Sequence, residues 1–250
     1  MTDTFEAQTA CLQKLYDKSS RIVFFGGAGV STESGIPDFR SQDGLYNQNW
    51  SYPPETIISR SFFDAHPAEF YRFYREKLIV KNVRPNTAHT VLARMEALGK
   101  LSAVVTQNID GLHQAAGSKN VFELHGSTLR NYCMQCGEAY SVDFIAESAG
   151  EKDGIPHCLK CGGKIKPDVV LYEESLNQNC IDGAIRAISY ADMLIIGGTS
   201  LAVYPAAGLI DYFRGETVVL INKSETPGDR KASLVIHESI GTVLGALKLE

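Results

Sequence analysis

The sequence predicts an α/β fold in which a parallel, Rossmann-like sheet carries helices on both faces and a second, small domain is attached. Strands that alternate with helices favour such a sheet. Polar or glycine-containing turns follow each strand, and ligands bind at that edge of a parallel sheet. The predicted strands are four short apolar runs separated by helical stretches: residues 22–25, 103–106, 193–196 and 218–221.

The chain has 250 residues, enough for one large α/β domain with a smaller insertion. No apolar run approaches the roughly 18–20 residues that cross a bilayer, and the first residues lack a secretory-signal pattern. A net charge of -5 argues against nucleic-acid binding, which usually needs a basic face. We therefore expect a cytoplasmic protein with neither a membrane nor a nucleic-acid partner.

Two segments interrupt the alternation of strands and helices. Residues 41–82 are rich in aromatic side chains and contain a helix opened by Pro67, and residues 131–166 contain clustered cysteines and polar turns. We interpret both as insertions that form the small domain. The Rossmann-like domain then comprises residues 1–40, 83–130 and 167–250, and a cleft between the two parts is the expected active site.

The clustered cysteines have the spacing of a zinc ribbon. They form two Cys-x2-Cys pairs, Cys133 with Cys136 and Cys158 with Cys161. Four thiolates complete a tetrahedron and leave no open position, so we predict one structural Zn²⁺ rather than a catalytic one. We expect the other two cysteines, Cys11 and Cys180, to be ordinary, partly buried thiols on helices.

A glycine-rich segment, residues 27–40, follows the first predicted strand, and its first half is typical of a phosphate-binding loop. It ends in Asp38, Phe39 and Arg40, whose chemical groups suggest a reaction on the bound ligand. The segment lacks both the Walker pattern and the acidic ribose-binding residue of the usual dinucleotide fingerprint. Further along, His125 follows an apolar strand end at the expected cleft wall, where a neutral imidazole could act as a general base.

Residues 106–110 after the second predicted strand, residues 198–200 after the third and Asn222 after the fourth complete the pattern. In this order, the motifs resemble those of the sirtuins, the NAD-dependent protein-lysine deacylases, and the resemblance extends from about residue 15 to about residue 240. The resemblance implies that NAD is a co-substrate and that acyl-lysine-containing proteins or peptides are the partners. The implied reaction removes acetyl groups from lysine side chains and yields nicotinamide and O-acetyl-ADP-ribose.

The resemblance also assigns roles to individual residues. It implies a catalytic role for His125, Asn108 and Asp110. The implied substrate-binding residues are Tyr74, Val170, Tyr172 and Val203. The implied cofactor-binding residues are Gly27, Ala28, Gly29, Ser31, Thr32, Asp38, Phe39, Arg40, Gln107, Asn108, Ile109, Asp110, Gly198, Thr199, Ser200, Asn222 and Ile240.

Two departures from the family pattern concern the substrate. Most sirtuins have Phe-Gly-Glu where this chain has Tyr172-Glu173-Glu174, and we expect the added carboxylate to favour cationic residues beside the target lysine. Sirtuins that act on succinyl-lysine carry a Tyr-x-x-Arg pair, whereas Tyr74 is followed here by Lys77, which cannot make the bidentate contact. We therefore favour deacetylation over a preference for longer or acidic acyl groups.

Two other functions remain open from the sequence. The same NAD site could donate ADP-ribose to a protein side chain, as in a mono-ADP-ribosyltransferase. The chain could also be a zinc-ribbon binding module that only senses NAD or ADP-ribose. The presence of His125 with Asn108 and Asp110 argues against a sensor, which needs no base.

Overall fold

The structure is a computed structural model that describes residues 4–39, 44, 50–150 and 153–249. Its largest sheet has six parallel strands in the order β3-β2-β1-β7-β8-β9. The strands are β1 (Ile22–Gly26), β2 (Leu101–Thr106), β3 (Val121–Glu123), β7 (Met193–Gly197), β8 (Thr217–Ile221) and β9 (Leu234–Ile236). The predicted fold class and its four strands are confirmed. β3 corresponds to the apolar strand end that the sequence analysis placed just before His125. β9 has three residues, which are too few to give a periodic signal in the sequence.

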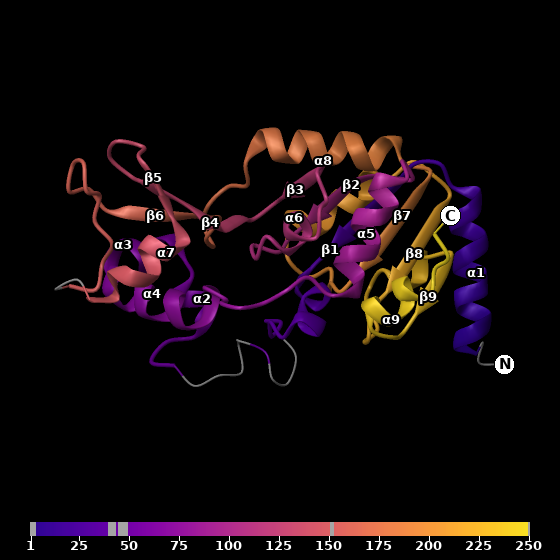
Figure 1. The fold of residues 1–250 in the computed structure, drawn as a ribbon, viewed down its shortest axis with the longest axis horizontal. Helices are drawn as coiled ribbons and strands as arrows, with labels where there is room; N and C mark the ends of the chain where they lie inside the picture. The colour runs from indigo at the N-terminus through magenta and orange to yellow at the C-terminus, as the bar shows by residue number, and fades with distance from the viewer. Residues whose placement is uncertain (1–3, 40–43, 45–49, 151–152, 250) are drawn as a thin grey trace.

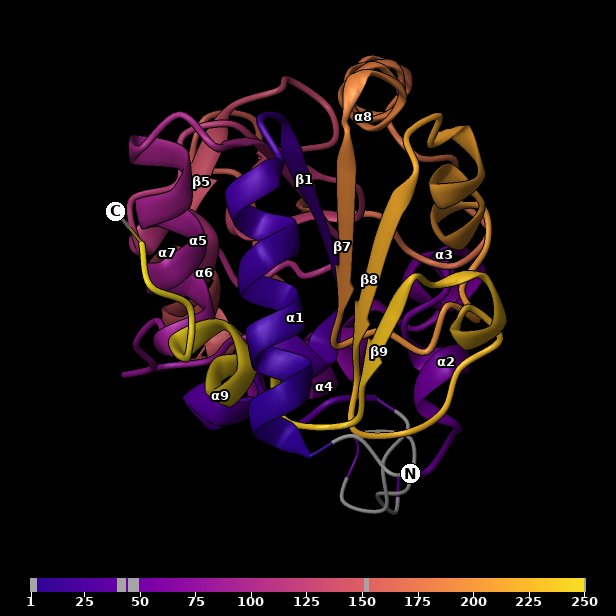
Figure 2. The same ribbon diagram turned by 90° about the vertical axis from the view of Figure 1, so that its right-hand side faces the viewer.

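Helices cover both faces of this sheet (Figures 1 and 2). One face is packed by α1 (Phe5–Lys18), α5 (Thr87–Ala97) and α9 (Ile240–Gly245), and the other by α8 (Gln178–Tyr190) and the 3₁₀ helix η6 (Ala206–Tyr212). Successive strand residues point to opposite faces. In β1, Ile22 and Phe24 contact the first helical layer, whereas Val23 and Phe25 contact the second. Every residue of β1 is buried, as expected for a central parallel strand.

The register of the strands brings their carboxyl ends to one edge. Gly26 at the end of β1 pairs with Thr106 of β2 on one side and with Gly197 of β7 on the other. Gly197 in turn pairs with Ile221 at the end of β8. The turns after these four strands therefore lie side by side, as binding at the strand ends of an open α/β sheet requires.

A second sheet lies at the other end of the molecule (Figure 1). Its antiparallel strands run in the order β5-β4-β6. They are β4 (Gly126–Cys133), β5 (Ala139–Ser141) and β6 (Ile165–Val169). The surrounding helices are α2 (Pro54–Ile57), α3 (Arg60–Ala65), α4 (Pro67–Phe73), the π-helix η4 (Tyr74–Leu78), α7 (Val142–Glu147) and the 3₁₀ turn η5 (Ser148–Gly150). Pro67 opens α4 as predicted.

One hydrophobic cluster joins the aromatic-rich segment to the cysteine-containing segment. Phe63 and Phe70 of the former share this core with Cys133, Ile145 and Ile165 of the latter. The two interruptions of the αβ pattern therefore fold together, although residues 83–130 of the chain separate them.

The remaining elements are short, and the structure tests two further expectations about single residues. The short elements are η1 (Ala28–Val30), η2 (Thr32–Ser34), α6 (Leu112–Ala115) and η7 (Asp229–Lys231). Cys180 is partly buried on α8 as predicted, but the same prediction for Cys11 is wrong. Cys11 is exposed because it lies on α1 next to Leu12, which takes the position facing the core. Within the described residues, no helix is both long and apolar enough to cross a membrane.

Candidate active site

A cavity of about 870 Å³ opens at the carboxyl edge of the large sheet and extends to the second sheet. Its size is typical of a cleft that binds a cofactor-sized ligand. The turns after β1, β2, β7 and β8 all contribute to its wall. The structure brings these predicted site residues together there: Gly27, Ala28, Gly29, Ser31, Thr32, Asp38, Phe39, Gln107, Asn108, Ile109, Asp110, His125, Val170, Tyr172, Gly198, Thr199, Ser200, Val203, Asn222 and Ile240.

Among the described residues predicted to bind the cofactor or the substrate, Tyr74 is the one that does not line the cavity. Arg40 lies outside the described residues. Tyr74 is 0% exposed and its ring stacks on Phe70 in the second core, so its side chain is part of the packing of η4. Lys77, one turn further along, does line the cavity. This helical turn therefore directs the side chain of Lys77, and not that of Tyr74, toward the cavity.

The glycines of the β1 turn are needed for contact between two loops. A Cβ atom on Gly29 would lie 2.8 Å from the Cα of Gly198, and one on Gly27 would lie 2.9 Å from the Cβ of Thr199. The amide of Gly29 donates to the carbonyl of Gly198 at 2.8 Å, and that of Gly27 donates to Gly197 at 3.3 Å. These two N–H groups are therefore engaged within the protein, and the glycines bring the β1 and β7 turns together at the cavity wall.

Behind the turn after β2, three polar side chains form a hydrogen-bonded group. The hydroxyl of Ser31 donates to Asp110 Oδ2 at 2.7 Å and accepts from the amide of Asn108 at 3.1 Å. The other carboxylate oxygen of Asp110 accepts from the backbone amide of Leu112 at 2.9 Å. Ser31 is 1% exposed and Asn108 8% exposed. Fixed hydrogen bonds of this kind hold the Asp110 carboxylate and the Asn108 amide in one orientation at the cavity wall.

His125 follows β3 and faces the cavity in a defined protonation state. Its Nδ1 lies 3.0 Å from the carbonyl oxygen of Gln107. Because a carbonyl can only accept, Nδ1 carries the proton and Nε2 keeps its lone pair. Burial lowers the pKa of His125 from its usual value, and the hydrogen bond to Gln107 offsets part of that effect. The neutral form is therefore favoured near pH 7, as a general base requires.

Gln107 also connects two of the turns. While its carbonyl accepts from His125, its side-chain amide donates to the hydroxyl of Thr199 at 3.1 Å. Thr199 in turn accepts from the backbone amide of Leu201 at 3.2 Å. The orientation of the imidazole is thereby coupled to the turn after β7.

A wall from the second sheet and its helices closes the outer part of the cavity. The second sheet and its helices contribute Val169 at the end of β6, residues 170–174 after it, Ile58, Lys77, Leu78 and Val80. The segment between β7 and η6 adds Val203, Tyr204 and Pro205. The sequence analysis had named Lys77, Val170, Tyr172, Glu173, Glu174 and Val203 here. Isolated apolar residues such as Ile58 and Leu78 carry no chemical signal in a sequence. Tyr204, which is 73% exposed, directly follows Val203.

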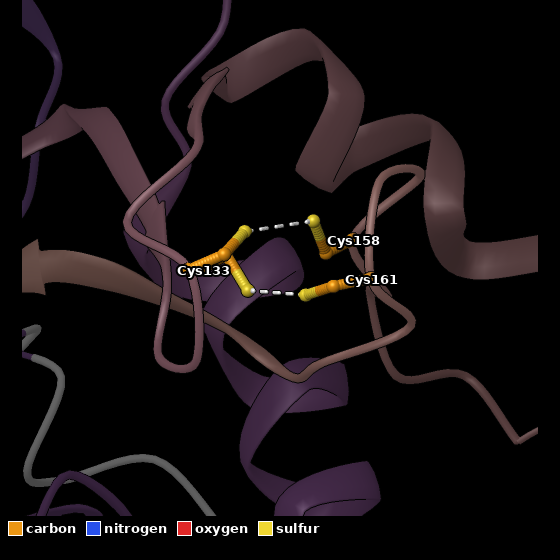
Figure 3. A group of neighbouring side chains, drawn as sticks. Cys133, Cys158 and Cys161 are labelled. Carbon is orange, nitrogen blue, oxygen red and sulfur yellow. Dashed lines mark hydrogen bonds between the residues drawn. The ribbon is translucent and has the colours of Figure 1, made fainter.

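The four cysteines lie together and fit a zinc ion. Their sulfur atoms are all within 4.8 Å of one another, with 3.4 Å between Cys133 and Cys161 and 3.6 Å between Cys136 and Cys158. Figure 3 shows cysteine side chains pointing toward one another from two loops. A tetrahedral zinc with Zn–S bonds of about 2.3 Å places its sulfurs about 3.8 Å apart.

Glycines shape the two loops that present the sulfurs. Gly137 and Gly162, each with φ of 74°, follow the second cysteine of each pair. Their amides donate to the carbonyls of Cys133 at 3.0 Å and Cys158 at 2.8 Å, which closes each turn. A left-handed residue at these places favours glycine. The cluster therefore has the donor set, the spacing and the backbone of a structural zinc site.

Two histidines are buried behind the Asp110 group. The rings of His89 and His113 are 4.7 Å apart and are 0% and 1% exposed. Burial lowers the pKa of His89 to about 4 and that of His113 to about 3. Both are packed in the core and neither lines the cavity.

Comparison with known proteins agrees with this geometry. Residues 27–205 match the family model described as Sir2 family. The chain is 64% identical over 237 residues to the NAD-dependent protein deacetylase of Clostridium perfringens (strain 13 / Type A), covering 94% of this chain and 96% of the relative.

Solved structures agree with the sequence matches. A structure of a Sir2 variant with deacetylated p53 peptide and 3'-O-acetyl ADP ribose superimposes with a TM-score of 0.89 at 38% identity, covering 96% of both chains. A Sir2 complex with p53 peptide and NAD⁺ superimposes with a TM-score of 0.84 at 40% identity, covering 94% of both chains. The resemblance inferred from the sequence is thus confirmed, and the chain belongs to the Sir2 family.

Proposed function

We propose that this chain removes acetyl groups from protein lysine side chains and consumes NAD, yielding nicotinamide and O-acetyl-ADP-ribose. The observation that carries the proposal is the single cavity that joins the glycine-rich turn, the base His125 and the outer wall after β6. A nucleotide and an extended peptide can both reach His125 in such a cavity. The deacetylase relatives and the peptide complexes of Sir2 support the same reaction.

NAD fits the inner part of the cavity. The residues that would hold its phosphates and riboses come from the turn after β1 and from Gly198, Thr199 and Ser200, with Asn222 and Ile240 at the adenosine end. NAD supplies the ribose carbon that accepts the acyl oxygen as nicotinamide leaves. Ser31 orients Asp110 and Asn108, and these two side chains provide the polar wall against which a carboxamide can be recognised.

His125 supplies the base. Its unprotonated Nε2 can take a proton from a ribose hydroxyl, and the carbonyl of Gln107 stabilises the imidazolium that results. Phe39 lines the same cavity and can exclude water from the ribose once nicotinamide has left. These groups are of little use to a protein that only senses NAD, which is why we prefer an enzyme over a binding module.

The acetyl group is the proposed acyl substrate. Lys77 could attract an acidic acyl chain because it lines the cavity. However, its ammonium lies 3.2 Å from the carboxylate of Glu76, and Tyr74 is enclosed in the second core. A lysine that is already paired makes a weaker partner for a distal carboxylate than a forked guanidinium. We therefore expect faster turnover of acetyl-lysine than of succinyl-lysine in the same peptide.

We also propose that the zinc ion is structural and that the chain divides as the sequence suggested. Residues 41–82 and 131–166 would form the small domain, and the rest the NAD-binding domain. The shared hydrophobic cluster around Cys133 and Cys158 supports this division. A cytoplasmic location is likewise proposed. It is supported by the paired cysteines, whose spacing suits zinc better than disulfides.

The experiment is a deacylation assay with NAD and one peptide carrying acetyl-, succinyl- or unmodified lysine. Nicotinamide release that requires acetyl-lysine in the wild type, and that is accompanied by deacetylation, supports the proposal. The His125→Ala variant should lose deacetylation by roughly 10²–10⁴-fold. Transfer of labelled ADP-ribose to protein without acyl-lysine would instead favour a mono-ADP-ribosyltransferase.

A further inference from the structure

Glu173 adopts a left-handed backbone conformation at the outer wall of the cavity, with φ of 76°. Residues other than glycine, asparagine and aspartate seldom adopt this conformation, because the Cβ atom crowds the neighbouring carbonyl. Such a residue keeps its conformation only where the surrounding structure holds it. The contacts of Glu173 and of its neighbours therefore hold the chain after β6 in this path.

The carboxylate of Glu173 binds two donors of one residue. It accepts from the backbone amide of Ser61 at 2.8 Å and from the Ser61 hydroxyl at 2.9 Å. Ser61 lies in the first turn of α3, where backbone amides have no partner within the helix. The side chain of Glu173 thus satisfies a free amide of α3 and fixes its own backbone at the same time.

The neighbouring residues are attached to the same segment. The amide of Tyr172 donates to the carbonyl of Ile58 at 3.1 Å, and the carbonyl of Tyr172 accepts from the amide of Arg60 at 3.0 Å. The carboxylate of Glu174 lies 3.1 Å from the guanidinium of Arg60 and 3.0 Å from the ammonium of Lys166. Residues 171–174 are therefore held along the chain that leads into α3.

We propose that Glu173 is a positioning residue for the acylated peptide, because its bonds to Ser61 preform the segment of the cavity wall on which the peptide lies. This inference rests on the proposed function, in which Val170 and Tyr172 contact substrate. It differs from the expectation that the carboxylate selects cationic residues beside the target lysine. Both donors of Ser61 point at the carboxylate, so its charge is directed at α3 and not at the peptide.

Three variants separate the effects of the carboxylate's hydrogen bonds, of the backbone strain and of the negative charge. Glu173→Ala loses the bonds and keeps the strain, Glu173→Gly loses the bonds and relieves the strain, and Glu173→Gln removes only the charge. A glutamine can still accept from the Ser61 amide and donate to its hydroxyl. Ser61→Ala removes one of the two donors, and its effect on the peptide Kd should not be additive with that of Glu173→Ala.

The measurements are the Kd of an acetyl-lysine peptide for the zinc-loaded full chain without NAD, and the KM values for peptide and NAD. Loss of one or two hydrogen bonds predicts a peptide Kd about 3–10-fold higher for Glu173→Ala, with a smaller rise for Glu173→Gly. Glu173→Gln should stay within about twofold of the wild type. The KM for NAD should not change, and the melting temperature should fall by no more than a few degrees, about 2–4 °C per kcal/mol lost, which distinguishes positioning from general loss of structure.

Glu55→Ala, which removes an exposed carboxylate from nearby α2, is the matched control and should leave the peptide Kd unchanged. Wild-type peptide affinity in both Glu173→Ala and Glu173→Gly would overturn the inference. So would a Glu173→Gln enzyme that loses a preference for arginine over glutamate beside the acetyl-lysine, since that outcome assigns the role to charge. A wild type that releases no nicotinamide with acetyl-peptide contradicts the proposed function itself, whatever the variants do.

Discussion

At the scale of single residues, the site depends on hydrogen bonds that set protonation and orientation. The Gln107 carbonyl gives His125 a free Nε2, and Ser31 sits between the Asp110 carboxylate and the Asn108 amide. Each of these contacts joins residues from different turns of the chain. Changing a donor or an acceptor in these contacts should therefore change the activity.

The activity should depend on the neutral form of His125. Its pKa is lowered from 6.5 by burial, so the imidazole is unprotonated above that pH and becomes protonated only as the pH falls below it. We expect kcat/KM for deacetylation to be constant from pH 7 upward until other groups titrate, and to fall with a slope of one at lower pH. A pH profile with an acid limb centred above pH 7 would contradict this role.

Ser31→Ala should disturb the Asp110 group without unfolding the protein. The change leaves the buried amide of Asn108 without its acceptor and removes a donor from Asp110. An unsatisfied buried group costs about 1–3 kcal/mol, which corresponds to a fall in kcat/KM for NAD of roughly 10–100-fold. Ser34→Ala is the control. The Ser34 hydroxyl is also buried in this loop but has no hydrogen-bond partner within the described residues, so steady-state kinetics should show no change.

At the scale of elements, the start of α5 and the short helix α6 are buried against each other behind the site. Asn86 caps α5 by accepting from the amides of Ala88 and His89. His89 then packs on His113 of α6, which also lies near Phe24 of β1. The helix start depends on local contacts, whereas the meeting of the two imidazoles depends on how both helices dock on the sheet.

This buried pair should make the fold sensitive to acid. His113 has a pKa of about 3 in the folded state and 6.5 as its ordinary value, so the unfolded chain takes up its proton first. The contribution of neutral His113 is fully present above pH 6.5 and is lost progressively as the pH falls toward 3. By pH 5 the loss amounts to about 2 kcal/mol.

Urea unfolding at pH 7 and pH 5 can measure this loss. The His113→Phe variant should lose about 2 kcal/mol less than the wild type between the two pH values, because phenylalanine does not titrate. Replacing the exposed His66 with glutamine should leave the difference unchanged. Equal losses in the wild type and in His113→Phe would show that His113 is not buried in its neutral form.

At the scale of the whole molecule, two separate cores meet at the cavity. The large sheet has its own clusters, and the second core contains Cys133 and Cys158 together with the aromatic residues of α3 and α4. The cavity wall draws on both parts, with the glycine-rich turn from one and Ile58 from the other. Loss of one core should therefore remove one half of the cavity.

Removal of zinc tests this arrangement. A chelator, or Cys133→Ser, should disorder the second core and abolish binding of acetyl-peptide, because four separated thiols do not hold the two loops together. ADP-ribose should still bind, since its proposed ligands lie on the turns of the large sheet. Calorimetric titration with each ligand measures both effects. Cys11→Ser changes an exposed thiol and should alter neither, and retained peptide binding without zinc would contradict the role of the metal.

Much of the fold and of the candidate site could be predicted because the signals are local. Strands such as β1 and β7 are continuous apolar runs, and the zinc cysteines have a fixed spacing within two short loops. Motif residues at the ends of strands needed only the general rule for parallel sheets. Short strands such as β9 and isolated wall residues such as Ile58 could not be predicted, because neither periodicity nor chemistry marks them.

The sequence by itself determined the parallel sheet and the four clustered cysteines, since both follow from patterns along the chain, and its resemblance to the sirtuins predicted the nucleotide-binding residues. Only the tertiary structure decided contacts between distant residues. It showed that Gly29 packs on Gly198, that Tyr74 is enclosed while Lys77 faces the cavity, and that Glu173 binds Ser61, 112 residues away. Such contacts depend on how separately formed elements dock, and no local pattern encodes that docking.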